Sequence, residues 1–161
     1  MRVADPVPAT AEDLAAVVAL LGREPQADFE VVVRTAAGAP VVLRNAPLLR
    51  DGTPMPTRYW LVDPDLNRLV GAVEAQGGVR AADAAIAPEV IAAVHAAYAA
   101  ERDAALPPGH TGPTPYGGVG GTRQGVKCLH AHYANLLAGA DDAVGAWTET
   151  ALDALDAEET A

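Results

Sequence analysis

The sequence predicts an α+β fold in which a small antiparallel three-stranded sheet packs with four to five helices. Two observations carry this prediction. Three short β-rich segments, at about 28–34, 40–44 and 57–62, follow one another along the chain, and helical periodicity replaces them from residue 63 onward. Strands grouped before helices are typical of α+β proteins rather than of proteins in which strands and helices alternate.

The first element is a predicted helix over Ala11–Leu21, because Thr10 is a good N-cap residue and apolar side chains recur on one face. Phe29–Arg34 and Val41–Arg44 are rich in β-branched residues and flank a turn that contains a glycine, which predicts a hairpin. The segment Thr57–Val62 alternates in character and is the third predicted strand.

The remaining elements are predicted to be helices, and capping residues and glycines mark their ends. Asp63 suits the N-cap of a helix and Pro64 its first position, and Gly77-Gly78 ends it. The helices after it are expected from Ala81 or Pro88 to about Ala105, from Gly125 to Ala138, and around Val144–Leu155.

Length, charge and composition limit the classes of protein. A chain of 161 residues fits one domain, which we place at 1–145, followed by an acidic C-terminal helix and tail at 146–161. The net charge of −10 argues against a binder of nucleic acid or of anionic membranes. Seven acids and no bases lie between Asp141 and Ala161, so this helix is a candidate surface for a protein partner.

The sequence also predicts a location for the protein. Its N-terminus has no apolar stretch of signal-peptide length, and no run of 18 apolar residues predicts a membrane span. A single cysteine, Cys128, excludes an intramolecular disulfide and fits a reducing compartment. We therefore expect a cytoplasmic protein.

The segment Leu106–Thr122 differs from the rest, because it holds six glycines and four prolines in 17 residues. Loops of this length in a compact domain are usually functional or disordered. Glycines let backbone N–H groups approach a ligand, and the start of the helix that follows attracts anions. The predicted anion-binding residues are Gly118, Gly120, Gly121, Arg123 and Lys127, with Arg58 from the third strand. A flexible surface loop is the structural alternative.

The segment Lys-Cys-Leu-His-Ala-His that follows carries the candidate catalytic residues, which are Cys128, His130 and His132. On a helix, Cys128 and His132 are four residues apart on one stripe and His130 points elsewhere. Cys128 could be a nucleophile with His132 as its base, or the two could bind a metal such as zinc with ligands from elsewhere in the chain. In the third interpretation, Cys128 is a small buried apolar residue.

A second group of polar residues shares one helical stripe. His95, Tyr98 and Arg102 lie on the same face of the helix that ends near Ala105. If this face meets the glycine-rich loop, His95 is a further candidate catalytic residue. In the alternative, Tyr98 packs in the core and Arg102 pairs with a neighbouring acid.

The segments GVGGTRQGVKCLHAHYANLLAG, PTRYWL and HAAYAAERD resemble a bacterial family known as domain of unknown function 501. The resemblance covers about Ala11 to Gly145. Where family members typically continue with Asn-Pro-Val-Gly, this chain has Asp142-Ala143-Val144-Gly145. The family has no assigned reaction. Its members often lie beside a septum-formation initiator protein and an exopolyphosphatase/guanosine-pentaphosphate phosphatase, so the resemblance implies a link to phosphate chemistry or cell division.

These observations support two hypotheses. In the first, the protein binds a phosphorylated or otherwise anionic small molecule through the glycine-rich loop and the Lys-Cys-x-His-x-His helix, and the sequence leaves open whether it also acts on that molecule. In the second, it is a non-catalytic interaction or regulatory module linked to cell division or to polyphosphate or alarmone metabolism. Its Cys/His segment is then structural or zinc-stabilised.

Overall fold

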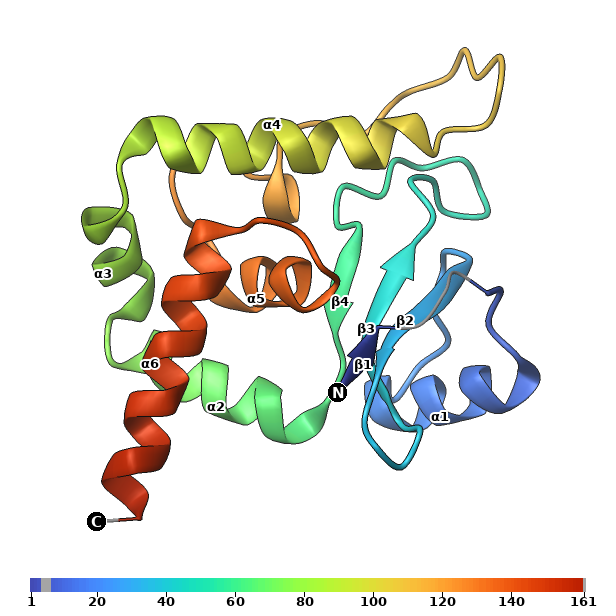
Figure 1. Ribbon diagram of the computed structural model, residues 1–161. Helices are drawn as coiled ribbons and strands as arrows, with labels where there is room; N and C mark the ends of the chain where they lie inside the picture. Colours follow the sequence, from blue (N-terminus) through green and yellow to red (C-terminus); the bar gives the residue numbers. More distant parts are fainter. Residues whose placement is uncertain (4–6, 161) are drawn as a thin grey trace.

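The computed structural model describes residues 1–3 and 7–160, and it confirms the α+β fold. A short sheet lies beside helices that come mostly from the second half of the chain (Figure 1). In chain order the elements are β1 (Arg2–Val3), α1 (Ala11–Leu21), β2 (Phe29–Arg34), β3 (Pro40–Asn45), β4 (Tyr59–Leu61), α2 (Pro64–Ala75), α3 (Gly78–Ala85), α4 (Pro88–Ala104), the 3₁₀ turn η1 (Val119–Gly121), α5 (Leu129–Leu137) and α6 (Ala143–Glu159).

The sheet is antiparallel with the strand order β1-β2-β3-β4. The three predicted strands are β2, β3 and β4. Both ends of each observed strand lie within two residues of the predicted bounds. The structure adds β1, a strand of two residues that is too short to produce a periodic pattern. Both edges of the sheet are therefore short, with two residues in β1 and three in β4.

Both faces of the sheet are covered, which explains why three successive valines, Val31, Val32 and Val33, are all buried. Val31 packs with Val17 of α1 on one face, and Val32 and Val33 belong to the larger core on the other. A shift in register between Val31 and Val33 interrupts the pairing with β3. Figure 1 shows α1 on one side of the strands and α2, α5 and α6 on the other.

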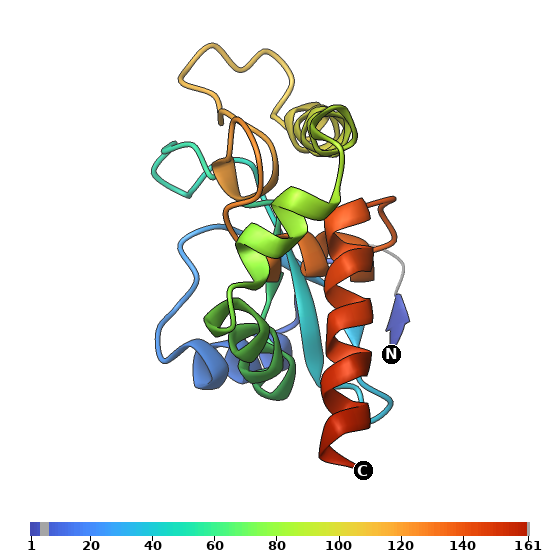
Figure 2. The same cartoon turned by 90° about the vertical axis from the view of Figure 1, so that its left-hand side faces the viewer.

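The helix α4 lies across one end of this layered core and is seen end-on in Figure 2. Ile91 of α4 belongs to the larger core, and Val94 and Tyr98 pack with Val119 of η1. The long loop between α4 and η1 thus returns to the helix from which it starts. None of the helices in the described part of the chain is long and apolar enough to cross a membrane.

There are six α-helices among the described residues, one more than the upper number expected, because the segment predicted from Ala81 or Pro88 is two helices. Gly77 adopts a positive φ of 90° and separates α2 from α3, as the double glycine predicts. Ile86 has an extended backbone and ends α3 before Pro88 starts α4.

The helix predicted from Gly125 begins four residues later, at Leu129. Asp83 of α3 accepts a hydrogen bond from the Val126 N–H, and Glu74 of α2 accepts one from the Leu129 N–H. These tertiary contacts hold the preceding residues outside the helix, and Cys128 has the extended backbone of an N-cap residue. The sequence pattern alone does not contain these partners.

Candidate functional site

The glycine-rich segment folds closely against α4. A Cβ atom on Gly118 would lie 2.3 Å from the Cβ of His95, so only glycine allows this approach. The Val119 N–H donates a hydrogen bond to His95 Nδ1 at 3.1 Å, and the opposite ring nitrogen, Nε2, then donates to the carbonyl of Gly125 at 2.8 Å. The loop therefore uses both nitrogens of His95.

The backbone of this loop is also tied to itself and to a buried arginine. Gly118 and Gly121 donate their N–H groups to the carbonyls of Thr122 and Gly118. Arg102, which is 1% exposed, donates to the carbonyl of Gly117 at 3.0 Å and pairs with Asp103. Here the loop offers carbonyls to the guanidinium of Arg102, and two of its three predicted anion-binding amides, those of Gly118 and Gly121, bond within the loop itself.

The two cations predicted to hold the anion, Arg123 and Lys127, do not line the same cavity. The guanidinium group of Arg123 lies over the ring of Tyr116 at 5.2 Å, and Arg123 lines a cavity of about 630 Å³ next to α4. Asp83 and Glu89 line the same cavity, so its charged residues sum to −1. Lys127 is exposed and does not line it.

The stripe of α4 that carries His95, Tyr98 and Arg102 does face the glycine-rich loop and the end of β4, and all three residues are buried. The Tyr98 hydroxyl accepts the N–H groups of Arg58 and Tyr59. Burial raises the pKa of Tyr98 to about 12, so this hydroxyl stays protonated at neutral pH. In this structure the stripe positions the backbone around it.

His132 lies in a sealed network at the junction of α5 and α6. Its Nδ1 donates to the carboxylate of Asp142, with distances of 2.9 and 3.0 Å. The same carboxylate accepts hydrogen bonds from Asn135 Nδ2 and from the N–H groups of Val144 and Gly145. His132 and Asp142 are each 1% exposed, and Nε2 of His132 has no hydrogen-bond partner among the described residues.

The thiol of Cys128 is close to His130 instead of to His132. Because Cys128 stands before the helix with φ −147° and ψ 119°, the predicted stripe that joins it to His132 is wrong. Its Sγ lies 3.9 Å from Nδ1 of His130, and it is partly exposed.

Glu74 completes this cluster from α2. Its Oε1 lies 3.2 Å from Nδ1 of His130, and Nε2 of His130 lies 3.0 Å from the carbonyl oxygen of Asn67. The hydrogen bond with Cys128, and then the Asn67 carbonyl and the Glu74 carboxylate, raise the pKa of His130 to about 9 against the effect of burial. Glu74, Cys128 and His130 thus form a partly exposed cluster that favours positive charge at its centre.

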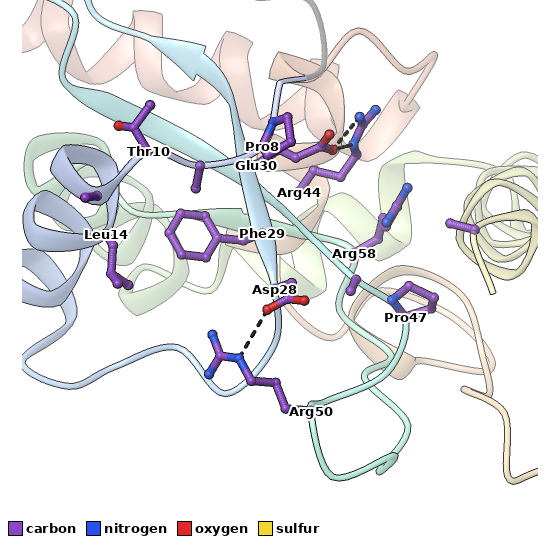
Figure 3. Close-up of a pocket in the computed structure, with 14 residues that line it drawn as sticks. Pro8, Thr10, Leu14, Asp28, Phe29, Glu30, Arg44, Pro47, Arg50 and Arg58 are labelled. Atoms are coloured by element: carbon purple, nitrogen blue, oxygen red, sulfur yellow. Dashed lines mark hydrogen bonds and ion pairs between the residues drawn. The ribbon is translucent and has the colours of Figure 1, made fainter. Parts of the chain in front are cut away.

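A second cavity, also of about 630 Å³, lies between the start of α1 and strands β2 and β3 (Figure 3). Its apolar wall includes Leu14 and Phe29. The charged residues of its lining are three arginines and two acids, whose formal charges sum to +1. They are Arg44, Arg50, Arg58, Asp28 and Glu30. In a protein of net charge −10, the residues that line this cavity sum to a net positive charge, and the acid that pairs with Arg58, Glu101, lies outside the lining.

The three arginines of this cavity differ in how firmly they are held. Arg58 is 8% exposed and donates to the carbonyl of Asn45 and to Glu101. Arg44 pairs with Glu30, whereas the pair between Arg50 and Asp28 is solvent-exposed, with side-chain exposures of 54% and 84%. Figure 3 shows the last two pairs as dashed lines.

The predicted site residues therefore fall into separate places. His130 and Cys128 lie together, Arg58 lies in the arginine-lined cavity, and His95 lies under the loop. Three further site residues, Glu74, Arg44 and Arg50, do not stand out in the sequence, because each joins its site only through tertiary packing. For Glu74 the available signal was an acid near the end of a predicted helix, which by itself is common.

The fold and these two sites define a small α+β domain that carries a Glu-Cys-His cluster and an arginine-lined cavity. The family model described as "Protein of unknown function (DUF501)" matches residues 31–150, and the chain belongs to this family. The matched residues contain the Glu-Cys-His cluster and all three cavity arginines, whereas α1 precedes them. No curated protein and no solved structure matches the chain.

Proposed function

We propose that the protein binds a small molecule with a phosphate or carboxylate group in the cavity between α1 and the sheet. The observation that best supports this proposal is the charge of the cavity lining, which has three arginines, Arg44, Arg50 and Arg58, and two acids. Guanidinium groups are well suited to these anions, because their planar arrays of donors match the oxygens of carboxylate and phosphate. The proposed anion site therefore differs from the one predicted at the glycine-rich loop, and the two sets of residues share only Arg58.

The size and wall of the cavity favour a ligand with an apolar part. A volume of about 630 Å³ lies in the range of small-molecule sites, which are mostly apolar with a few polar groups that fix orientation. Phe29 and Leu14 supply an apolar surface. A ligand that combines an anionic group with a ring or short aliphatic part fits these features.

The acids beside the arginines leave room for an incoming anion. Asp28 is exposed, and exposed ion pairs contribute only about 0–1 kcal/mol to stability, so a ligand can replace this carboxylate on Arg50 at little cost. Arg58, by contrast, is held by the Asn45 carbonyl and is already oriented before a ligand arrives. Arg50 is therefore the side chain at which binding is best tested.

The test is a thermal-melting and calorimetric screen against phosphate, pyrophosphate, polyphosphate and nucleotides at millimolar concentration, with a chelator present throughout. We expect at least one compound to raise the melting temperature, and we expect Arg50→Gln to weaken its binding about tenfold or more. Arg80→Gln, which changes an exposed arginine of α3 outside the cavity, should leave binding unchanged. An unmoved melting temperature across the panel, or equal binding by Arg50→Gln, would contradict the proposal.

A further inference from the structure

We propose that Glu74, Cys128 and His130 bind a divalent metal ion of the zinc class, with one coordination position left for water or an anionic ligand. This inference is separate from anion binding in the arginine-lined cavity, and neither requires the other. It rests on the spacing of three ligand atoms, on the hydrogen bonds that fix the ligand side chains and on the chemical type of the ligands.

The spacing matches a tetrahedral zinc site. With usual zinc–ligand bond lengths, a thiolate sulfur and an imidazole nitrogen on one ion are separated by roughly 3.6 Å, and an imidazole nitrogen and a carboxylate oxygen by roughly 3.3 Å. The distances here are 3.9 Å from Cys128 Sγ to His130 Nδ1 and 3.2 Å from that nitrogen to Glu74 Oε1. All three ligand atoms lie within 4.8 Å of one another, so only small side-chain movements separate them from a coordination shell.

The support behind His130 is the kind that metal-binding histidines have. Such a histidine usually donates its second ring N–H to a carbonyl or carboxylate, which fixes the ring and its tautomer. Nε2 of His130 lies 3.0 Å from the Asn67 carbonyl and donates its proton there, so the nitrogen that faces the cluster is Nδ1, and its proton would leave when a metal ion binds. Asn67 is held in turn by a hydrogen bond from its own side chain to the carbonyl of Leu61.

Glu74 is fixed as well. Its Oε1 accepts the Leu129 N–H at 2.7 Å, which anchors the carboxylate to the first turn of α5. Cys128 is the N-cap residue of the same helix and makes no side-chain capping bond, so its sulfur is not needed by the helix. Two helices, α2 and α5, therefore bring the ligands together.

The chemical types of the three ligands select the metal. A thiolate disfavours magnesium and calcium and favours zinc and related transition metals. One thiolate, one carboxylate and one neutral imidazole carry two negative charges, which balance a divalent ion. Structural zinc sites usually have four protein ligands, whereas three ligands and an open position are typical of sites that bind water or substrate. His130 and Glu74 each keep 27% of their side-chain surface exposed, which gives a fourth ligand access.

The experiment measures metal binding by the full chain, purified without a histidine tag and stripped with a chelator. Zinc is titrated calorimetrically, and cobalt serves as a spectroscopic probe because it gives a thiolate charge-transfer band and strong visible bands when tetrahedral. We expect one ion per chain and a cobalt spectrum with both features. Cys128→Ser, His130→Gln and Glu74→Gln should each weaken zinc binding about 100-fold or more, and Cys128→Ser should abolish the charge-transfer band.

The matched control is His110→Gln, because His110 lies in the loop after α4 and its ring contacts the Pro113 carbonyl. We expect this variant to bind zinc like the wild type. A second measurement avoids dependence on the folding of Cys128→Ser: zinc should slow the alkylation of Cys128 about tenfold in the wild type and leave it unchanged in Glu74→Gln. Equal zinc affinity in Glu74→Gln and the wild type, or a cobalt spectrum without the thiolate band, would overturn the proposal.

Discussion

Two histidines of α5, only two residues apart, stand in opposite surroundings. His132 is buried at the junction of α5 and α6. The carboxylate that it contacts, Asp142, accepts hydrogen bonds from four donors. His130 is partly exposed on the other side of the helix and contacts a thiol and a carboxylate. A separation of two residues turns the side chain by roughly 200° on a helix, which is why neighbours in sequence reach different partners.

This difference shows that the surroundings of a histidine decide whether it stabilises the fold or is available for chemistry. The carboxylate of Asp142 is hydrogen-bonded by groups of its own fold on both helices, so the His132 cluster holds α5 and α6 together. In the His130 cluster, two groups that can carry negative charge surround one ring nitrogen, and solvent reaches them. Variants of the first cluster should therefore change stability, and variants of the second should change binding.

The largest expected effect is on the sealed cluster. Asp142→Ala removes the acceptor of His132, Asn135 and the first turn of α6, and should lower the free energy of unfolding by about 3–5 kcal/mol. Asp142→Asn should cost less, because an asparagine oxygen can still cap the helix. Denaturant unfolding measures both. A cost below about 1 kcal/mol for Asp142→Ala would mean that the His132 cluster contributes little to stability, which would contradict the structural role assigned to it.

Zinc should separate the two clusters. If the ion binds only the folded protein, free zinc at about 100 times its dissociation constant raises the free energy of unfolding by about 2.7 kcal/mol. We expect this gain in the wild type and in Asp142→Asn, and its loss in Glu74→Gln. Melting curves with zinc and with chelator provide the measurement. A gain retained by Glu74→Gln and lost in Asp142→Asn would reverse the roles assigned to the clusters.

Gly118→Ala tests a third contact, in which the glycine-rich loop packs against His95. The new Cβ would collide with His95, whose ring lies 5.6 Å from that of His132, and should cost about 2 kcal/mol. Zinc affinity should not change. The matched control is Gly71→Ala, because Gly71 lies inside α2 with open space around it, and there alanine should be neutral or stabilising. A stable Gly118→Ala protein would mean that the loop can move off α4.

Asp13 provides a reference carboxylate outside both clusters. Its hydrogen bonds with the Arg34 guanidinium lower the pKa of Asp13, so the stability it contributes is present above its ordinary pKa of 3.8 and is lost as pH falls through the lower value. Asp13→Asn should cost about 1 kcal/mol at pH 7, through the capping box of α1 and this pair. Unfolding curves between pH 7 and strong acid should show the difference shrinking, and a constant difference would contradict the assignment.

The sequence analysis predicted the α+β class, the three longer strands and the caps of α1 and α2, because each depends on residues close together in the chain. It extended α5 to Gly125, because Asp83 and Glu74, which accept the N–H groups of Val126 and Leu129, come from distant helices.

The candidate sites show the same limit. Cys128 and His130 were identified as residues capable of chemistry, yet Cys128 was paired with His132, because the helical spacing was applied to a residue that lies before the helix. Arg44 and Arg50 carry no local pattern that marks a cavity. Their common location comes from the turn of the chain between β3 and β4, which only the folded structure reveals.

The short outer strands of the sheet have a consequence for self-association. An exposed strand edge is a template on which another chain can add, and long flat edges favour fibrils. Here β4 spans three residues and β1 only two, so each outer margin offers few free backbone groups to a passing chain. The valine-rich strands β2 and β3 take the two central positions, and along the outer edge of β2 the chain pairs at Val33 and Arg34 through β1 and at Glu30 through Pro8, which leaves few places for intermolecular pairing.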